Sequence, residues 1–223
     1  GGGGAGGGRG AAARGKGNAA LILGQCGAGK TCLFYRLAHD TFPDTISSLE
    51  PQDRTGPLKL EEDGTGAPRR MLDFPGHARL RPQLIEGLQA AGCVVFVLDA
   101  TNHDPAVLRE LADLMYDVFA ECIRINIEPP VLVACNKSDL PGAASPDALR
   151  KKLAKELDGI KTTRHTLDTE GDDAAEIVLG TDDSPFDFDV DAGCPVSFAS
   201  VSALKGGADV DAVVEHIAAS LSS

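Results

Sequence analysis

Short, mainly apolar segments alternate along the chain with longer segments whose apolar residues recur every three or four positions. Mainly apolar runs of strand length lie at 19–23, 70–74, 93–98, 131–135 and 196–199, with a further possible strand at 58–60 in an otherwise loop-like stretch over 40–66. Amphipathic spacing predicts helices over 31–39, 80–91, 105–125, 148–157 and 210–221. Buried strands separated by helices are typical of a parallel sheet covered on two sides. We therefore predict one α/β domain, with a mostly parallel six-stranded sheet and helices on both faces.

Composition marks the limits of this domain. Residues 1–17 contain ten glycines, four alanines, two arginines and one lysine, which predicts a flexible Gly-rich tail before a domain over 18–223. A second unusual segment is a variable acidic loop at about 159–194. Within it, residues 168–191 carry ten carboxylates and no lysine or arginine. We expect a solvated spacer there, in preference to a metal site or a binding site.

Charge and cysteine usage narrow the function classes. The net charge is −12, which argues against direct nucleic-acid recognition, because that requires a basic face. The six cysteines form no CxxC pair and have no metal-ligand spacing, so we expect reduced thiols, several of them buried. No run approaches the roughly 18 apolar residues of a membrane-spanning helix.

The first strand runs into a sequence that matches the phosphate-binding loop G-x-x-x-x-G-K-[ST]. The loop residues are Gly24, Gln25, Cys26, Gly27, Ala28, Gly29, Lys30 and Thr31, and Cys32 follows them in the helix. Phosphate oxygens need converging backbone N–H groups and a close approach, which glycines allow, and the helix N-terminus adds positive potential. We expect Lys30 to neutralise the β and γ phosphates and the Thr31 hydroxyl to bind Mg²⁺. A simple glycine-rich turn is the alternative.

A carboxylate and a Pro-Gly-His turn follow the strand at 70–74. Asp73 at the end of this strand can hold Mg²⁺ through water. Gly76 leaves an N–H for a γ-phosphate, and His77 lies where a side chain that orients the attacking water would lie. His77 is therefore the candidate catalytic residue.

Two further loops predict selectivity for guanine. Asn136, Lys137 and Asp139 follow the strand at 131–135. A carboxylate at Asp139 can accept hydrogen bonds from the N1–H and the exocyclic amine of guanine, which adenine does not offer; a helix N-cap is its alternative role. We expect Asn136 to tie this loop to the phosphate-binding loop and the Lys137 stem to cover one face of the base. The backbone N–H groups of Ser202, Ala203 and Leu204, after the last strand, could reach the guanine O6.

These motifs together resemble the Ras/Arf superfamily of small GTPases over residues 18–222. Within it, the chain is most similar to the family of signal recognition particle receptor beta subunits. The resemblance rests on GQCGAGKTCLFYRL, DFPGHARLR, VLVACNKSDL and KKLAKELDGIKTTRHTLD, followed by a long variable segment before SALKGG. The 62 residues at 140–201 exceed the length that is usual in Ras and Arf proteins at this point.

The resemblance implies a P-loop GTPase that binds GTP and Mg²⁺ on the cytosolic face of the endoplasmic reticulum membrane. It implies that the protein docks the receptor alpha subunit in a GTP-dependent way during co-translational targeting, near the ribosome and the translocon. Members of the family are anchored by an N-terminal transmembrane helix. The sequence shows a Gly-rich tail in that place, so the membrane location rests on resemblance alone.

Two features of the resemblance concern the switch and hydrolysis. A threonine after the first helix normally completes the Mg²⁺ site, and we select Thr45, with Ser47 and Ser48 as competitors, Thr41 as a weaker one, and a solvent-exposed turn as the alternative role of Thr45. Ras-like enzymes carry glutamine where His77 stands and glycine where Cys26 stands, so we expect slow intrinsic hydrolysis.

Other interpretations remain open at this point. An Arf-like GTPase of vesicle trafficking is the main alternative, and a degenerate GTPase fold kept as a scaffold is another. The intact Lys30, Thr31, Asp73, Asn136 and Asp139 argue against the scaffold. The segment 136–139 argues against an ATP-using kinase.

Overall fold

The centre of the fold is a six-stranded sheet with the order β2-β3-β1-β4-β5-β6. A computed structural model describes residues 17–39, 52–56, 69–74, 81–168, 177–181, 183–204 and 209–221. Its strands are β1 (Ala19–Gly24), β2 (Gln52–Gly56), β3 (Arg69–Asp73), β4 (Ala91–Asp99), β5 (Val131–Asn136) and β6 (Val196–Ser200). Strands β3, β1, β4, β5 and β6 are parallel, and β2 pairs with β3 in the antiparallel sense. The predicted fold class is confirmed: five parallel strands, extended by one antiparallel edge strand.

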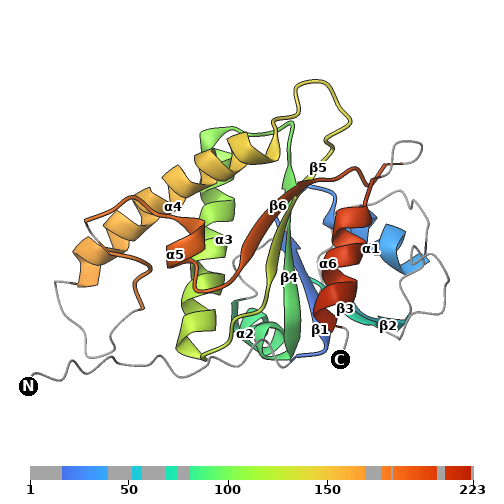
Figure 1. Cartoon of the computed structure of the whole chain (residues 1–223), viewed down its shortest axis with the longest axis horizontal. Coiled ribbons are helices and arrows are strands. Elements are labelled where there is room, and N and C mark those ends of the chain that lie inside the picture. Colours follow the sequence, from blue (N-terminus) through green and yellow to red (C-terminus); the bar gives the residue numbers. More distant parts are fainter. Residues whose placement is uncertain are drawn as a thin grey trace, which may run out of the picture.

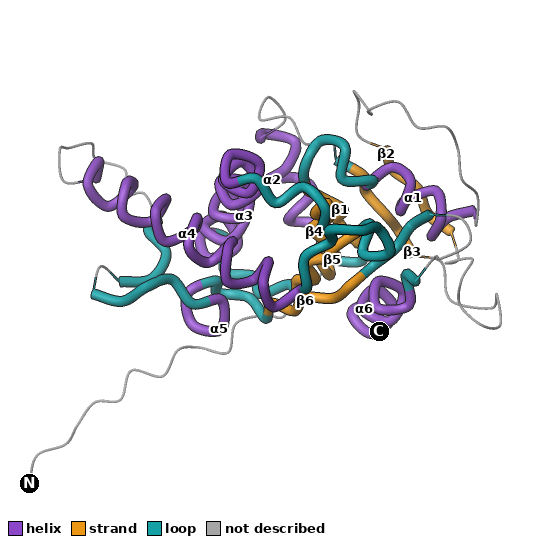
Figure 2. The backbone as a smooth tube through the Cα atoms, turned by 90° about the horizontal axis from the view of Figure 1, so that it is seen from above, coloured by secondary structure: helices purple, strands orange, loops and turns teal. Residues whose placement is uncertain are grey.

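Helices cover both faces of this sheet (Figures 1 and 2). They are α1 (Lys30–His39), α2 (Arg81–Ala90), α3 (Pro105–Arg124), α4 (Pro146–Asp168), the single turn α5 (Phe188–Asp191) and α6 (Asp211–Leu221). Helices α1 and α6 pack on one face, and α3, α4 and α5 lie on the other, with α2 beside α3. The result is the three-layered arrangement that parallel sheets require.

Alternation along the central strand divides the core into two parts. In β1, Leu21 and Leu23 belong to the apolar cluster under α2, α3 and α4, whereas Ala20 and Ile22 belong to the cluster under α1 and α6. All six residues of β1 are buried, which explains why the strand reads as an uninterrupted apolar run. Because the five parallel strands point the same way, their carboxyl ends meet at one edge of the sheet. The loops that carry the sequence motifs start from that edge.

The edge strand β2 lies in a segment that we expected to be loop-like. Its sequence, Gln-Asp-Arg-Thr-Gly, is polar and has no apolar signal. Asp53 and Arg70 stabilise it, since the Arg70 guanidinium donates two hydrogen bonds from Nε and Nη2 to Asp53 Oδ2, the shorter at 2.6 Å. The possible strand at 58–60 lies outside the described residues. Polar edge strands escape detection because apolar periodicity is the main sequence signal of a strand.

The predicted acidic loop at 159–194 is only partly a loop. Helix α4 continues to Asp168, and α5 forms within the acidic stretch. Leu179, Phe186 and Phe188 are buried against the α3–α4 side of the core, so they anchor the described part of this segment. The expectation of a solvated spacer over the whole interval is therefore wrong. A few large apolar residues among many carboxylates are enough to fix this segment to the core, because burying each of their side chains is favourable by about 1.5 to 3 kcal/mol.

Several predictions concern residues outside the described ranges. These are the tail at 1–16, the switch candidates Thr41, Thr45, Ser47 and Ser48, the turn residues Gly76 and His77, and the acidic residues 169–176. Within the part of the chain that the structure describes, no helix has both the length and the apolar character needed to cross a bilayer.

Candidate nucleotide-binding site

The loop between β1 and α1 depends on glycine at three positions. Gly24, Gly27 and Gly29 have φ angles of 136°, 75° and 92°, which residues with a Cβ rarely adopt. A Cβ at Gly24 would lie 2.1 Å from the Val97 carbonyl oxygen, whereas a Cβ at Gly27 would meet no described atom within 4 Å. The backbone of Gly27 therefore faces open space, as a cradle for a phosphate requires.

Lys30 opens helix α1 and folds back over this loop. Its ammonium donates to the carbonyl oxygens of Gly24, at 3.0 Å, and of Gln25, at 2.6 Å. Only 7% of the residue is exposed. Burial lowers the pKa of Lys30, while the charge of Asp73 opposes that shift. The lysine charge is thus held at the N-terminal end of α1, where an anion would be favoured.

Thr31 and Asp73 bring the phosphate-binding loop and the end of β3 together. The Thr31 hydroxyl donates to Asp73 Oδ2 at 3.3 Å. Asp73 is 1% exposed, and its second oxygen, Oδ1, is buried with no hydrogen-bond partner among the described residues. Burial raises the pKa of Asp73, opposed by the charge of Lys30 and the hydrogen bond from Thr31. A buried carboxylate oxygen left without a donor is suited to a cation or to water bound to one.

Asn136 joins three loops through one side chain. Its amide nitrogen donates to the Ala28 carbonyl at 2.8 Å, and its amide oxygen accepts from the Ala203 N–H at 3.0 Å. The residue is 2% exposed. The expectation that Asn136 ties its loop to the phosphate-binding loop is confirmed, and the same side chain also holds the Ser202–Leu204 loop. Next to it, the Ser138 hydroxyl donates to the Val201 carbonyl at 2.9 Å.

The Ser202–Leu204 loop is placed beside the site, but two of its N–H groups are engaged within the protein. Ala203 donates to Asn136, and Ser202 donates to the Asp209 carbonyl at 2.9 Å. The predicted contact with guanine O6 stays a prediction; it requires the Ala203 N–H to be shared or Leu204 to supply the donor. Cys32 supports this loop from α1, since its thiol donates to the Ala203 carbonyl at 3.6 Å.

The side chain of Gln25 turns away from the phosphate cradle. Its amide donates to the Val107 carbonyl and accepts from the Asp99 N–H, each at 3.3 Å. The Gln25 side chain is therefore engaged away from the cradle, and the Gln25 N–H donates to the Val97 carbonyl at 3.3 Å. Cys26 is exposed on the loop, whereas Ala28 is fully buried.

The guanine-binding candidates differ in their surroundings. Asp139 is exposed at the start of its loop, available to a ligand. Lys137 instead reaches back, and its ammonium contacts the Gly27 carbonyl at 3.0 Å and Asp99 Oδ2 at 2.5 Å. The predicted position of the Lys137 stem along a base is compatible with this reach across the loop edge.

Asp99 is the residue that the sequence reasoning missed. It ends β4, between the strands that carry the two predicted loops, and it contacts both of them through Gln25 and Lys137. The signal was present, since a carboxylate follows a long buried strand at the carboxyl edge of a parallel sheet. It was overlooked because Asp-Ala-Thr matches no familiar motif.

Comparisons with known proteins agree with this geometry. Residues 15–192 match the family described as signal recognition particle receptor beta subunit. The beta subunit of that receptor from Mus musculus is 34% identical over 194 residues, which are 85% of this chain and 69% of the mouse protein.

Two solved structures also resemble this chain in fold. A chain of the mammalian SRP receptor structure matches with a TM-score of 0.72 and 28% identity, covering 91% of this chain and 99% of that one. The SRb-GTP/SRX complex from Chaetomium thermophilum shares the fold with a TM-score of 0.67 at 22% identity, covering 90% of this chain and 97% of that one. On the extent of these matches, the chain belongs to the family of signal recognition particle receptor beta subunits.

Proposed function

We propose that the chain binds GTP at the loops around Gly27, Asn136 and Ala203. The observation that carries this proposal is the Asn136 side chain, which holds the three loops together through two hydrogen bonds of 2.8 and 3.0 Å. A phosphate cradle and a base-reading loop recognise a nucleotide only if they are fixed at one separation. Asn136 fixes it, and its burial leaves the bridge little freedom.

Mg²⁺ fits beside the phosphates. Thr31 and Asp73 would hold it, with Thr45 as the third predicted ligand, outside the described residues. The fit rests on the buried Oδ1 of Asp73, which has no donor among the described residues, and on the hydroxyl 3.3 Å from Oδ2. When bound, Mg²⁺ neutralises phosphate charge. Lys30 contributes the remaining positive charge at the helix N-terminus.

The receptor role follows from the family. We propose that the GTP-bound chain docks the alpha subunit of the signal recognition particle receptor at the cytosolic face of the endoplasmic reticulum membrane, in co-translational targeting. The complex of SRb-GTP with SRX from Chaetomium thermophilum supports a GTP-bound docking state. Slow hydrolysis fits this role, because a switch that retains GTP keeps its partner. Contacts with the ribosome or the translocon belong to the same proposal.

The first experiment measures the nucleotide retained by the purified protein, followed by titration with GTP and ATP in Mg²⁺. We expect retained GTP and no competition by ATP. Asp139→Asn should lose GTP and gain xanthosine triphosphate, because xanthine presents a carbonyl where guanine presents its amine and asparagine offers a matching N–H. Asp183→Asn, at an exposed carboxylate between α4 and α5, is the matched control.

Capture of a purified alpha subunit tests the docking role. We expect capture with GTP and its loss with GDP. Equal binding of GTP and ATP would contradict guanine selectivity, and capture that ignores the nucleotide would contradict GTP-gated docking.

A further inference from the structure

Lys137 has an unusual backbone conformation that its side chain explains. Its φ is 62°, and among the described residues only Asn126 is another non-glycine with positive φ. The left-handed conformation is unfavourable for a residue with a Cβ. The Lys137 ammonium is held by two acceptors, the Gly27 carbonyl and Asp99 Oδ2, which favour the strained conformation.

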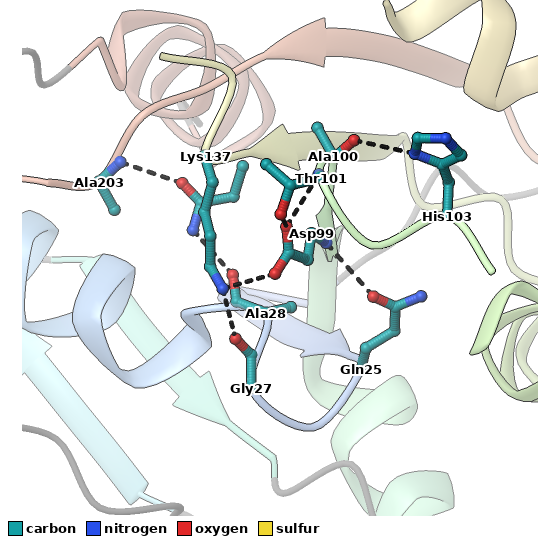
Figure 3. Close-up of polar contacts among 10 residues, drawn as sticks. Gln25, Gly27, Ala28, Asp99, Ala100, Thr101, His103, Lys137 and Ala203 are labelled. Atoms are coloured by element: carbon teal, nitrogen blue, oxygen red, sulfur yellow. Dashed lines mark hydrogen bonds and ion pairs between the residues drawn. The ribbon is translucent and has the colours of Figure 1, made fainter. Parts of the chain in front are cut away.

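Asp99 is itself held in one orientation. Its Oδ1 accepts from the Thr101 N–H at 2.9 Å and from the Thr101 hydroxyl at 2.6 Å, which leaves Oδ2 directed at Lys137 (Figure 3). Its own N–H donates to the Gln25 side chain. Burial raises the pKa of Asp99, but the hydrogen bonds from Lys137 and Thr101 outweigh burial and leave it lowered. The carboxylate is therefore charged at neutral pH.

This ion pair differs from the exposed pairs of the molecule. The side chains of Lys137 and Asp99 are 28% and 14% exposed, whereas those of Arg70 and Asp53 are 38% and 53% exposed. Partial burial weakens the screening by water and salt. In addition, the Lys137–Asp99 pair joins three segments: the phosphate-binding loop, the end of β4 and the loop after β5.

We propose that Asp99 is a positioning residue for the nucleotide: it fixes the Lys137 ammonium against Gly27 and so sets how slowly the nucleotide leaves. The inference rests on the proposed binding of GTP. Asp99 acts through Lys137, whose stem is held at the edge shared by the phosphate and base loops. When the charge of Asp99 is removed, Lys137 loses its ion-pair partner and the left-handed conformation loses part of its support. The two loops then separate more readily, and release becomes faster.

The test is the dissociation rate of a fluorescent GDP analogue from the full chain in Mg²⁺. Asp99→Asn keeps the shape and removes the charge, and we expect release about tenfold faster, equivalent to about 1.4 kcal/mol. Asp117→Asn is the matched control, because Asp117 is 16% exposed and pairs with Arg164 at 2.7 Å on the α3–α4 side. The control should release GDP at the wild-type rate.

A double-mutant cycle distinguishes positioning from general support of the fold. Lys137→Met should speed release by itself, and Asp99→Asn added to it should have no further effect. If the two effects multiply, Asp99 does not act through Lys137 and the proposal is overturned. A wild-type rate in Asp99→Asn overturns it as well.

A milder variant keeps the proposal testable if Asp99→Asn fails to fold. Thr101→Val keeps the Asp99 charge but removes one hydrogen bond that orients it, and about threefold faster release is expected. An unchanged rate in this variant argues against the orientation step. If the wild-type protein binds no guanine nucleotide, the proposed function itself is wrong. If the wild type binds GDP and Asp99→Asn releases it at the same rate, only the role of Asp99 is wrong.

Discussion

Alanine at Gly24 and at Gly27 should have very different effects on stability, although both residues belong to the phosphate-binding motif and both have positive φ. At Gly24, with φ of 136°, the new Cβ would lie 2.1 Å from the Val97 carbonyl oxygen. That oxygen also accepts the Gln25 N–H at 3.3 Å. At Gly27, with φ of 75°, no described atom lies within 4 Å of the new Cβ.

The expected magnitudes follow from these distances. Gly24→Ala combines about 1 to 3 kcal/mol of backbone strain with about 1 kcal/mol for the displaced hydrogen bond, and the strand must shift to relieve the overlap, so we expect a loss of about 3 kcal/mol or more. Gly27→Ala should lose only about 1 to 2 kcal/mol, from the left-handed conformation alone. For a chain of this size, each kcal/mol lowers the melting temperature by about 2 to 4 °C.

Thermal unfolding followed by circular dichroism compares the two variants directly. Gly27→Ala should stay folded at 25 °C but bind GTP poorly, because its methyl group enters the phosphate cradle. Gly24→Ala should melt far lower or fail to fold. Equal melting temperatures for the two variants would refute the reasoning, since the overlap with the Val97 carbonyl and the φ of 136° both make Gly24 the costlier position.

Three further predictions concern buried polar groups away from the loop. Lys161→Met should lower the free energy of unfolding in urea by about 2 to 3 kcal/mol, because Lys161 is 2% exposed and its ammonium donates to two backbone carbonyls. Lys155→Met, at an exposed position on the same helix, should change it by less than about 0.5 kcal/mol, and equal effects of the two variants would contradict the role of burial. Tyr116→Phe should cost about 1 to 3 kcal/mol by leaving the buried Leu179 N–H without its acceptor, and a melting temperature equal to wild type would argue against that bond. Burial lowers the pKa of His216 below 6.5, and backbone hydrogen bonds oppose this shift. The contribution of His216 to stability is therefore present above pH 6.5 and is lost as the pH falls. Between pH 7.5 and 5.5 the stability of the wild type should drop more steeply than that of His216→Leu, and parallel curves would show that His216 is not the source of the pH dependence.

The sequence was most informative where a residue of a nucleotide-binding motif lies at the end of an apolar strand. Gly24, Asp73 and Asn136 each end a buried strand, and the parallel direction of β1, β3 and β5 brings them to one edge of the sheet. The pattern of apolar strands therefore predicted both the fold class and the neighbourhood of the site. Of the site predictions themselves, the bridge through Asn136 is confirmed by two hydrogen bonds.

The features that the sequence did not predict depend on contacts between residues far apart in the chain. Asp99 and Gln25 are coupled although 74 positions separate them, and no local pattern shows which side chain turns inward. The continuation of α4 to Asp168 and the burial of Phe188 were hidden by the surrounding carboxylates. Composition reports the average character of such a segment, whereas packing is decided by the few residues that reach the core.

The bridge from Asn136 to Ala203 also has a consequence in time. The Cys32–Ala203 contact spans 171 positions, so the site contains residues from both ends of the domain. At about 5 to 20 residues per second, the ribosome needs roughly 10 to 35 s to add the later loop after the phosphate-binding loop has been made. A nascent chain that ends before Ala203 has the phosphate cradle but not the second anchor of Asn136. The proposed nucleotide site is therefore complete only in a chain that has been synthesised past Ala203.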